Sequence, residues 1–233
     1  MHEISLFGQI SLGRHEQVLN ILAGLAAMQP RPLYEKHTLY MPKKTAQSDA
    51  QVQKVNKKPQ NVQPTYTHVI ETFNSADYGK TLSPQGQKVR YVETPEPETK
   101  AFILRRVEES DVTPDDLQKY SDPNKFSKVG DYYIEGQRLT CRDLAISLYR
   151  HILPDQADDG TTEGKVDVFK LDGMKLLDPS GAFIVEATVR IDDRTKPALV
   201  QTATEELNWF RSETKGSIDM RVPERLSLDT RVR

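Results

Sequence analysis

The sequence is poor in cysteine and nearly balanced in charge. Cys141 is the single cysteine among 233 residues, so an internal disulfide framework is impossible, as is typical of a reducing compartment such as the cytosol or nucleus. The formal net charge of −2 excludes a chain-wide basic footprint for nucleic acid. Apolar residues make up 36%, below the usual share of about 45–50%, which predicts long polar loops within a folded chain.

Long hydrophobic runs are absent as well. The apolar stretch at residues 18–28 is shorter than the about 20 residues that a membrane span needs. The basic region of a signal peptide is missing ahead of it. We therefore expect a protein of the cytoplasm or nucleus that has no membrane contact.

The common catalytic and nucleotide-binding motifs are also missing. There is no phosphate-binding loop, no dinucleotide-binding glycine pattern, no nucleophile elbow and no H-E-x-x-H zinc motif. No histidine has another histidine three or four residues away, which excludes a helical pair of metal ligands. We therefore predict no catalytic residue, no metal site and no cofactor.

Carboxylates leave one enzymatic alternative open. A β-barrel can hold a divalent metal with a Glu-x-Glu pair, because alternate residues of a strand point to the same side. Here Glu96 and Glu98 lie in a proline-rich loop, and Glu186 stands alone in a hydrophobic strand, so we interpret each as an exposed charge. A metal-dependent RNA triphosphatase-like tunnel enzyme remains the alternative function.

What the sequence does contain is a series of short segments with alternating hydrophobicity, the pattern of β-strands. In residues 182–191, alternate positions from Phe183 to Ile191 are apolar and are expected to share one face. Similar patterns predict strands at residues 2–10, 33–41, 66–73, 87–93, 101–107, 131–139, 166–171 and 225–232.

Two segments follow helical spacing instead. From Arg14 to Met28, apolar residues recur at three- and four-residue intervals, and Pro30 ends the pattern. Residues 198–213 form the second predicted helix, with Pro197 suited to its first turn. Many short strands with two helices indicate a mainly β (α+β) fold. We predict one domain over residues 1–233, an antiparallel β-barrel or strongly curved sheet with two helices packed across it.

Two further segments depart from these patterns. Residues 42–64 contain no aromatic residue, Leu or Ile, so they cannot bury enough surface to offset their ordering entropy. We predict a disordered basic and polar loop within the domain. Residues 139–153 fit a helix through Leu144 and Leu148, and they also fit a strand through Leu144, Ile146 and Leu148. Periodicity alone leaves both open.

The N-terminal segment resembles that of a known family. The L-F-G-Q strand at Leu6–Gln9, the helix at Arg14–Gly24 and the Q-P-x-P motif at Gln29–Pro32 are similar to the start of the fungal Mediator subunit 18 family. The central and C-terminal strands of that family are similar to residues 133–139, 148–150 and 182–193. The resemblance thus covers most of the chain, with residues 42–64 as its variable part.

The resemblance implies a nuclear, non-enzymatic subunit in the head module of Mediator, the coactivator of RNA polymerase II. Its β-barrel would be similar to that of tunnel-type RNA triphosphatases. The implied partners are Mediator subunit 20, in a heterodimer, and the C-terminal helix of Mediator subunit 8. The rest of the head module and RNA polymerase II would be contacted indirectly, with no direct sequence-specific binding of nucleic acid. The resemblance also favours a strand for residues 139–153.

We expect a partner contact in residues 139–153, where apolar residues exceed what one core-facing side requires. The predicted contact residues are Leu144, Ile146, Leu148 and Tyr149. Docking would use an exposed apolar patch or a groove that accepts an amphipathic helix. The alternative is that all four residues belong to the core.

Overall fold

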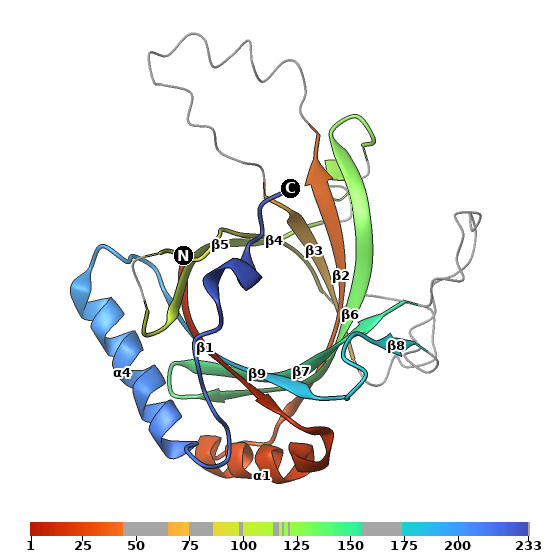
Figure 1. Cartoon of the computed structure of the whole chain (residues 1–233). Coiled ribbons are helices and arrows are strands. Elements are labelled where there is room, and N and C mark those ends of the chain that lie inside the picture. Colours follow the sequence, from red (N-terminus) through yellow and green to blue (C-terminus); the bar gives the residue numbers. More distant parts are fainter. Residues whose placement is uncertain are drawn as a thin grey trace.

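The strands close into an antiparallel β-barrel, seen end-on in Figure 1. The computed structural model describes residues 1–43, 65–74, 86–97, 100–113, 117, 119–120, 122–154 and 174–232. Its strands are β1 (His2–Ile10), β2 (Arg31–Pro42), β3 (Thr67–Phe73), β4 (Gly86–Val92), β5 (Ile103–Asp111), β6 (Phe126–Cys141), β7 (Leu144–Leu153), β8 (Lys175–Leu176) and β9 (Phe183–Ile191). The ring runs β6-β2-β3-β4-β5-β1-β9-β7 and closes because β6 pairs with β7, while β8 extends from β7.

Two helices lie against one side of the barrel, α1 (His15–Ala26) and α4 (Pro197–Glu213) (Figure 1). Helix α1 carries Glu16 in its first turn, near the positive end of the helix dipole, and it ends where Ala27 adopts a left-handed conformation with φ of 50°. Short 3-10 helices lie at η1 (Leu12–Arg14) and η3 (Arg225–Leu228). In the part of the chain that the structure describes, no helix has the length and apolar character to cross a membrane.

The main hydrophobic core lies between the helices and the outer face of the barrel wall. Alternate residues of β9 from Phe183 to Ile191 are buried there with Leu207 and Phe210 of α4. The single face predicted for residues 182–191 is therefore confirmed. Because each fully buried Leu or Phe side chain contributes about 1.5–3 kcal/mol, this layer is a main source of stability. It also includes Ile4, Leu6, Val18, Leu22, Leu139, Leu144, Ile146 and Leu148.

A second, smaller core covers another part of the outer wall. Val69 of β3 and Val89 of β4 are buried with Tyr120, and Tyr40 and Phe126 pack against them. The rings of Tyr120 and Phe126 are 5.0 Å apart between centroids, a favourable aromatic distance. Apolar side chains thus cover these two parts of the barrel wall from outside.

The predicted fold class and two helices are confirmed, and the open segment 139–153 is resolved. Residues 139–141 end β6, Arg142 adopts a left-handed turn conformation with φ of 54°, and β7 follows. The turn allows Leu144 to pair with Cys141 and Leu148 with Gln137. A strand, and not a helix, is therefore correct here. Cys141 is buried.

The prediction of a strand at residues 225–232 is wrong. Its first four residues form η3, and the segment then crosses one end of the barrel in Figure 1. Local hydrogen bonds compete with strand pairing, since Ser227 Oγ donates to the Glu224 carbonyl and the Arg231 backbone N–H donates to the Asp229 carboxylate. Residues 166–171, and residues 44–64 of the predicted loop, lie outside the described residues.

Candidate functional site in the barrel lumen

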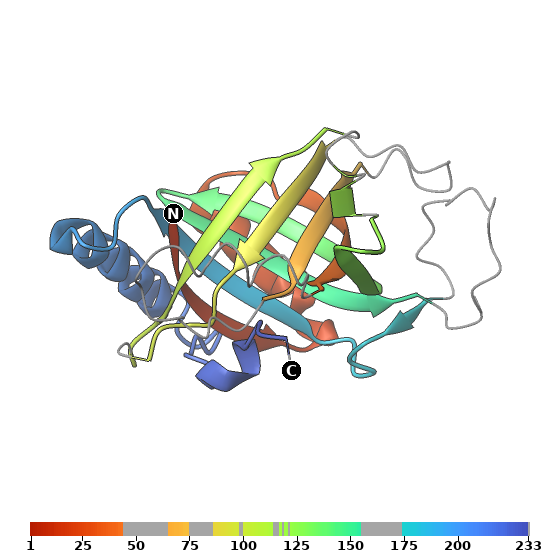
Figure 2. The same ribbon diagram turned by 90° about the horizontal axis from the view of Figure 1, so that it is seen from above.

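The inner face of the barrel wall carries polar and charged side chains around a cavity of about 170 Å³. Successive residues of a strand point to opposite sides, so the apolar outward positions of β1 and β9 leave Glu3, Ser5, Glu186 and Thr188 facing inward. Seen from above in Figure 2, the strands run obliquely around this space. The ionisable residues that line the cavity are Glu35, His37, His68, Arg90, Arg105, Arg138, Tyr132, Tyr149, His151 and Glu186.

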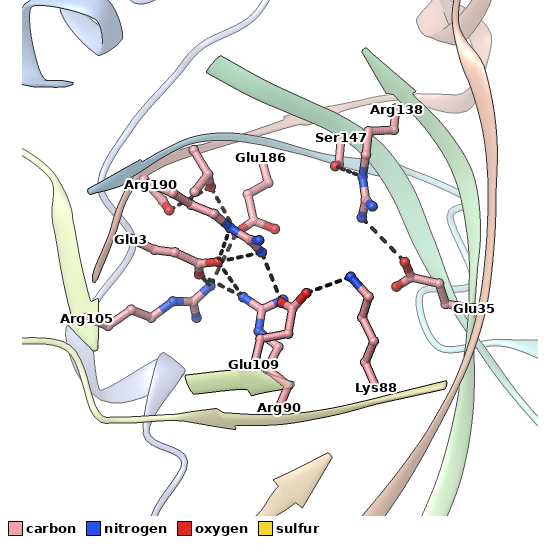
Figure 3. A network of polar contacts seen from close by, with 12 residues as sticks. Glu3, Glu35, Lys88, Arg90, Arg105, Glu109, Arg138, Ser147, Glu186 and Arg190 are labelled. Atoms are coloured by element: carbon pink, nitrogen blue, oxygen red, sulfur yellow. Dashed lines mark hydrogen bonds and ion pairs between the residues drawn. The ribbon is translucent and has the colours of Figure 1, made fainter. Parts of the chain in front are cut away.

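Glu3 is the centre of an ion-pair group inside the barrel (Figure 3). Its side chain is 2% exposed, and its carboxylate lies 2.7 Å from Arg90, 3.3 Å from Arg105 and 3.1 Å from Arg190. Arg190 also contacts the Glu109 carboxylate at 3.1 Å. A buried charge is tolerated only when it is paired and hydrogen-bonded, and these guanidinium groups meet that requirement. The group ties β1, β4, β5 and β9 together across the lumen.

Glu186 forms a second set of contacts beside the first. Its carboxylate lies 3.3 Å from Arg105 and accepts hydrogen bonds from the Tyr149 hydroxyl at 3.1 Å and from Thr188 Oγ1 at 3.4 Å. Loss of hydration, together with the charge of Glu186, raises the pKa of Tyr149 well above its usual value, so the hydroxyl stays protonated and donates. The interpretation of Glu186 as an exposed charge is wrong, because the curved wall turns its side chain inward toward Arg105.

A third set joins β2, β6 and β7. Glu35 accepts a hydrogen bond from His37 at 3.0 Å and lies 3.5 Å from Arg138, whose Nε donates to Ser147 at 3.2 Å. Burial by itself would raise the pKa of Glu35, but the hydrogen bond from His37 and the charge of Arg138 outweigh burial and lower it. Glu35 is therefore ionised at neutral pH and holds two strands together.

His68 lines the lumen in an environment that disfavours its protonated form. Burial lowers the pKa of His68 to about 4, and electrostatic interactions with His37, Arg90 and Arg105 act in the same direction. His68 is therefore neutral at neutral pH. Its imidazole lines the cavity in the uncharged form, because protonation would be opposed both by the loss of hydration and by electrostatic repulsion.

These contacts limit what the lumen can do chemically. Each of the four carboxylates Glu3, Glu35, Glu109 and Glu186 already has a cationic partner. A general base needs a free carboxylate with a pKa near the working pH, and a metal needs several free oxygens. Among the described residues, no group of three His, Cys, Asp or Glu side chains could hold a metal ion. The polar groups therefore serve as cross-strand ties.

The four predicted contact residues divide between the two faces of β7. Leu144, Ile146 and Leu148 each have 0% exposure and belong to the core under the helices. Tyr149 points into the lumen and donates to Glu186. The structure thus brings three of them together in the core and places the fourth apart. Their role as partner contacts stays a prediction.

Sequence reasoning missed the residues of the lumen network. Glu3, Arg90, Arg105 and Arg190 each lie at the polar positions of an alternating strand, where an exposed side chain would be equally consistent with the pattern. One signal could have found these residues. If a barrel is assumed, several strands carry charged residues of both signs at the positions that point inward. Pairing these positions requires the strand register, which places Glu3 opposite Arg105 of β5 and opposite Arg190 of β9.

Comparisons with known proteins agree over nearly the whole chain. A family model described as Med18 protein matches residues 2–231. Two curated relatives, from Aspergillus oryzae and Aspergillus niger, are each called Mediator of RNA polymerase II transcription subunit 18. They are 26% and 25% identical to this chain, and the alignments cover 100% of both proteins. A chain in the structure of the Schizosaccharomyces pombe Mediator head module has a similar fold, with a TM-score of 0.73 and 16% identity over 96% of this chain and 99% of that chain.

Proposed function

The chain belongs to the Med18 family, whose model matches residues 2–231, and from this premise we propose that its barrel is a docking module that holds neighbouring subunits in place. The family is a non-catalytic one, and the chain is a nuclear subunit of the Mediator head module, a transcription coactivator for RNA polymerase II. The alternative of a metal-dependent RNA triphosphatase-like tunnel enzyme is therefore dropped.

The observation that carries the docking role is the cross-tied barrel itself. Ion pairs and hydrogen bonds join strands that are far apart in the sequence, such as Glu3 with Arg190 and Tyr149 with Glu186. A closed sheet also has few free edges for unspecific pairing. Such a shell presents its outer surface with little conformational freedom to lose, and preorganisation of this kind lowers the entropic cost of binding.

The proposed partners are Mediator subunit 20, in a heterodimer, and the C-terminal helix of Mediator subunit 8. Several large apolar side chains support contacts of this kind because they remain exposed on the isolated chain. Leu12 and Val129 are each 54% exposed and Leu177 is 57% exposed. Apolar anchors of this type fit the hydrophobic face of an amphipathic helix or a second barrel.

Co-expression with subunits 8 and 20 tests this proposal. We expect the three chains to elute together in size-exclusion chromatography, and deletion of the C-terminal helix of subunit 8 to release that subunit alone. The substitutions Leu177→Asp and Val129→Asp test the proposed apolar anchors, because both side chains are exposed and lie outside the core. A folded chain that elutes alone in the presence of both full-length partners would contradict the proposal.

A further inference from the structure

A basic groove lies on the outside of the molecule, away from the lumen. It has a volume of about 520 Å³ and is formed by the start of α1, the last turns of α4 and the segment that follows α4. We call it the α4 groove. Its lining includes Arg14, Asn208, Arg211, Lys215, Ile218 and Met220.

The cations of the α4 groove stand out because they have no partner in the described part of the chain. Only Arg14, Arg31 and Arg211 among the described arginines have a side chain with no hydrogen bond or ion pair to another described residue. Two of these three line the α4 groove, and the side chain of Lys215, also without such a partner, joins them. Asp219 is the one carboxylate among the described lining residues, and it is paired with Arg221 at 2.8 Å.

The helix dipoles explain the positions of only two of the three cations in the α4 groove. Arg211 lies in the last turn of α4 and Lys215 just after it, where cations are favourable beside the negative end of the helix dipole. Arg14 is the N-cap of α1, at the positive end of that helix, where a cation is unfavourable. Three cations around one groove therefore include one whose position works against local stability.

The floor of the α4 groove is apolar and firmly packed. Ile218 is 3% exposed and Met220 is 1% exposed, and both press on β1 at Gly8. A Cβ at Gly8 would lie 2.8 Å from Ile218 Cγ2, so only glycine lets the segment approach this closely. Arg221 then exchanges two backbone hydrogen bonds with Phe7. The groove thus has a packed apolar base and an exposed cationic rim.

We propose that the α4 groove binds an acidic peptide segment of another subunit of the head module. Carboxylates of that segment would pair with Arg14, Arg211 and Lys215. Among the described residues, no aromatic side chain lines the groove to stack on bases, and the net charge of the chain is −2, so a peptide fits better than nucleic acid. This inference rests on the proposed function, because it requires that the chain works inside an assembly.

Carbodiimide cross-linking in the assembled head module tests the inference directly. The reagent activates a carboxylate, the Lys215 amine attacks it to form an amide, and the carbodiimide leaves as the urea. We expect mass spectrometry to find Lys215 joined to Asp or Glu of another subunit. If Lys215 in the module stays unlinked and is acetylated as readily as in the free chain, the inference is wrong, while membership in the module stands.

A charge-reversal series provides the second test. The probe is a fluorescent peptide of about twelve residues that alternates Glu and Leu, a length matched to one docked segment, with a Gln-for-Glu peptide as the neutral control. Arg14→Glu, Arg211→Glu and Lys215→Glu combined should weaken binding of the acidic peptide about tenfold or more, since several contacts change sign. Arg31→Glu is the matched control, because Arg31 is the third of the described arginines without a partner and lies outside the groove.

The outcomes of this series are distinct. The inference is supported if the acidic peptide shows a salt-sensitive rise in fluorescence anisotropy on binding, and if this rise is lost with the triple variant and retained with Arg31→Glu. Equal binding of the Glu and Gln peptides, or equal loss in both variants, overturns it. Tighter, variant-sensitive binding of oligouridine than of the acidic peptide would also overturn it, by showing a nucleic-acid groove. All four substituted residues are exposed, so the variants are expected to fold.

Discussion

On β1, β7 and β9, the outer and inner faces of one wall have opposite chemistry. The outer face presents Leu6, Leu148 and Val185 to the helices, and these residues have at most 1% exposure. The inner face presents Glu3 and Glu186 to the lumen, where arginines neutralise them. A small barrel can be stabilised from outside by apolar burial while its inside is joined by ion pairs, and the two faces should therefore respond differently to substitution.

The largest loss is expected on the outer face. Phe210→Ala in α4 removes a ring with 0% exposure from the centre of the main core, and large-to-small changes of this kind cost about 3–5 kcal/mol. Urea unfolding measures the loss. Leu177→Ala, at a position that is 57% exposed, is the matched control and should change the free energy of unfolding by less than about 0.5 kcal/mol. Equal effects of the two substitutions would show that the outer core is not the main source of stability.

On the inner face, Glu3→Gln is expected to cost about 3 kcal/mol, because it leaves Arg90, Arg105 and Arg190 without their shared carboxylate. The value lies at the low end for a broken buried pair, since the Arg190 side chain is 44% exposed and can be hydrated. Glu108→Gln breaks an exposed pair with Arg106 and should cost less than about 1 kcal/mol. If Glu3→Gln left the free energy of unfolding unchanged, the lumen pairs would contribute nothing to stability.

The same division explains what could be predicted from the sequence. Hydrophobic periodicity is local, so it predicted the face of β9 from Phe183 to Ile191 correctly, and in α1 it identified the side that buries Val18 and Leu22, although Ile21 is 36% exposed. The lumen is not local, because Glu3 meets Arg190 only through the pairing register of β1 with β9. Residues 225–232 show a further limit, since side-chain hydrogen bonds at Asp229 turn an alternating pattern away from a strand.

A third prediction uses His68, one of the histidines that line the lumen. The pKa of His68 is lowered to about 4 in the folded chain and returns to the ordinary value of 6.5 on unfolding. Between these values the unfolded chain binds a proton that the folded chain does not, so stability falls as the pH drops from about 6.5 to about 4. The contribution of His68 is about 2–3 kcal/mol across this window.

His68→Phe isolates this effect from that of the carboxylates. The difference in free energy of unfolding between pH 7 and pH 4.5 should be smaller in the variant than in the original chain, as measured by urea unfolding at both pH values. His15→Phe is the control, since His15 hydrogen-bonds Gln137 outside the lumen. An unchanged pH dependence in His68→Phe would contradict the lowered pKa that burial, and secondarily His37, Arg90 and Arg105, give to His68.

The smallest expected effect separates the two faces at adjacent residues of β7. Tyr149→Phe removes the hydroxyl that donates to Glu186 and should cost about 1 kcal/mol, the net value of one hydrogen bond. A double-mutant cycle with Glu186→Gln measures the coupling between the two groups. The neighbouring Leu148→Ala, on the outer face, should cost about 2–5 kcal/mol and should show no coupling to Glu186. If Leu148 coupled to Glu186 as strongly as Tyr149 does, the wall would transmit strain between its faces, and the apolar layer and the ionic lumen would be one energetic unit.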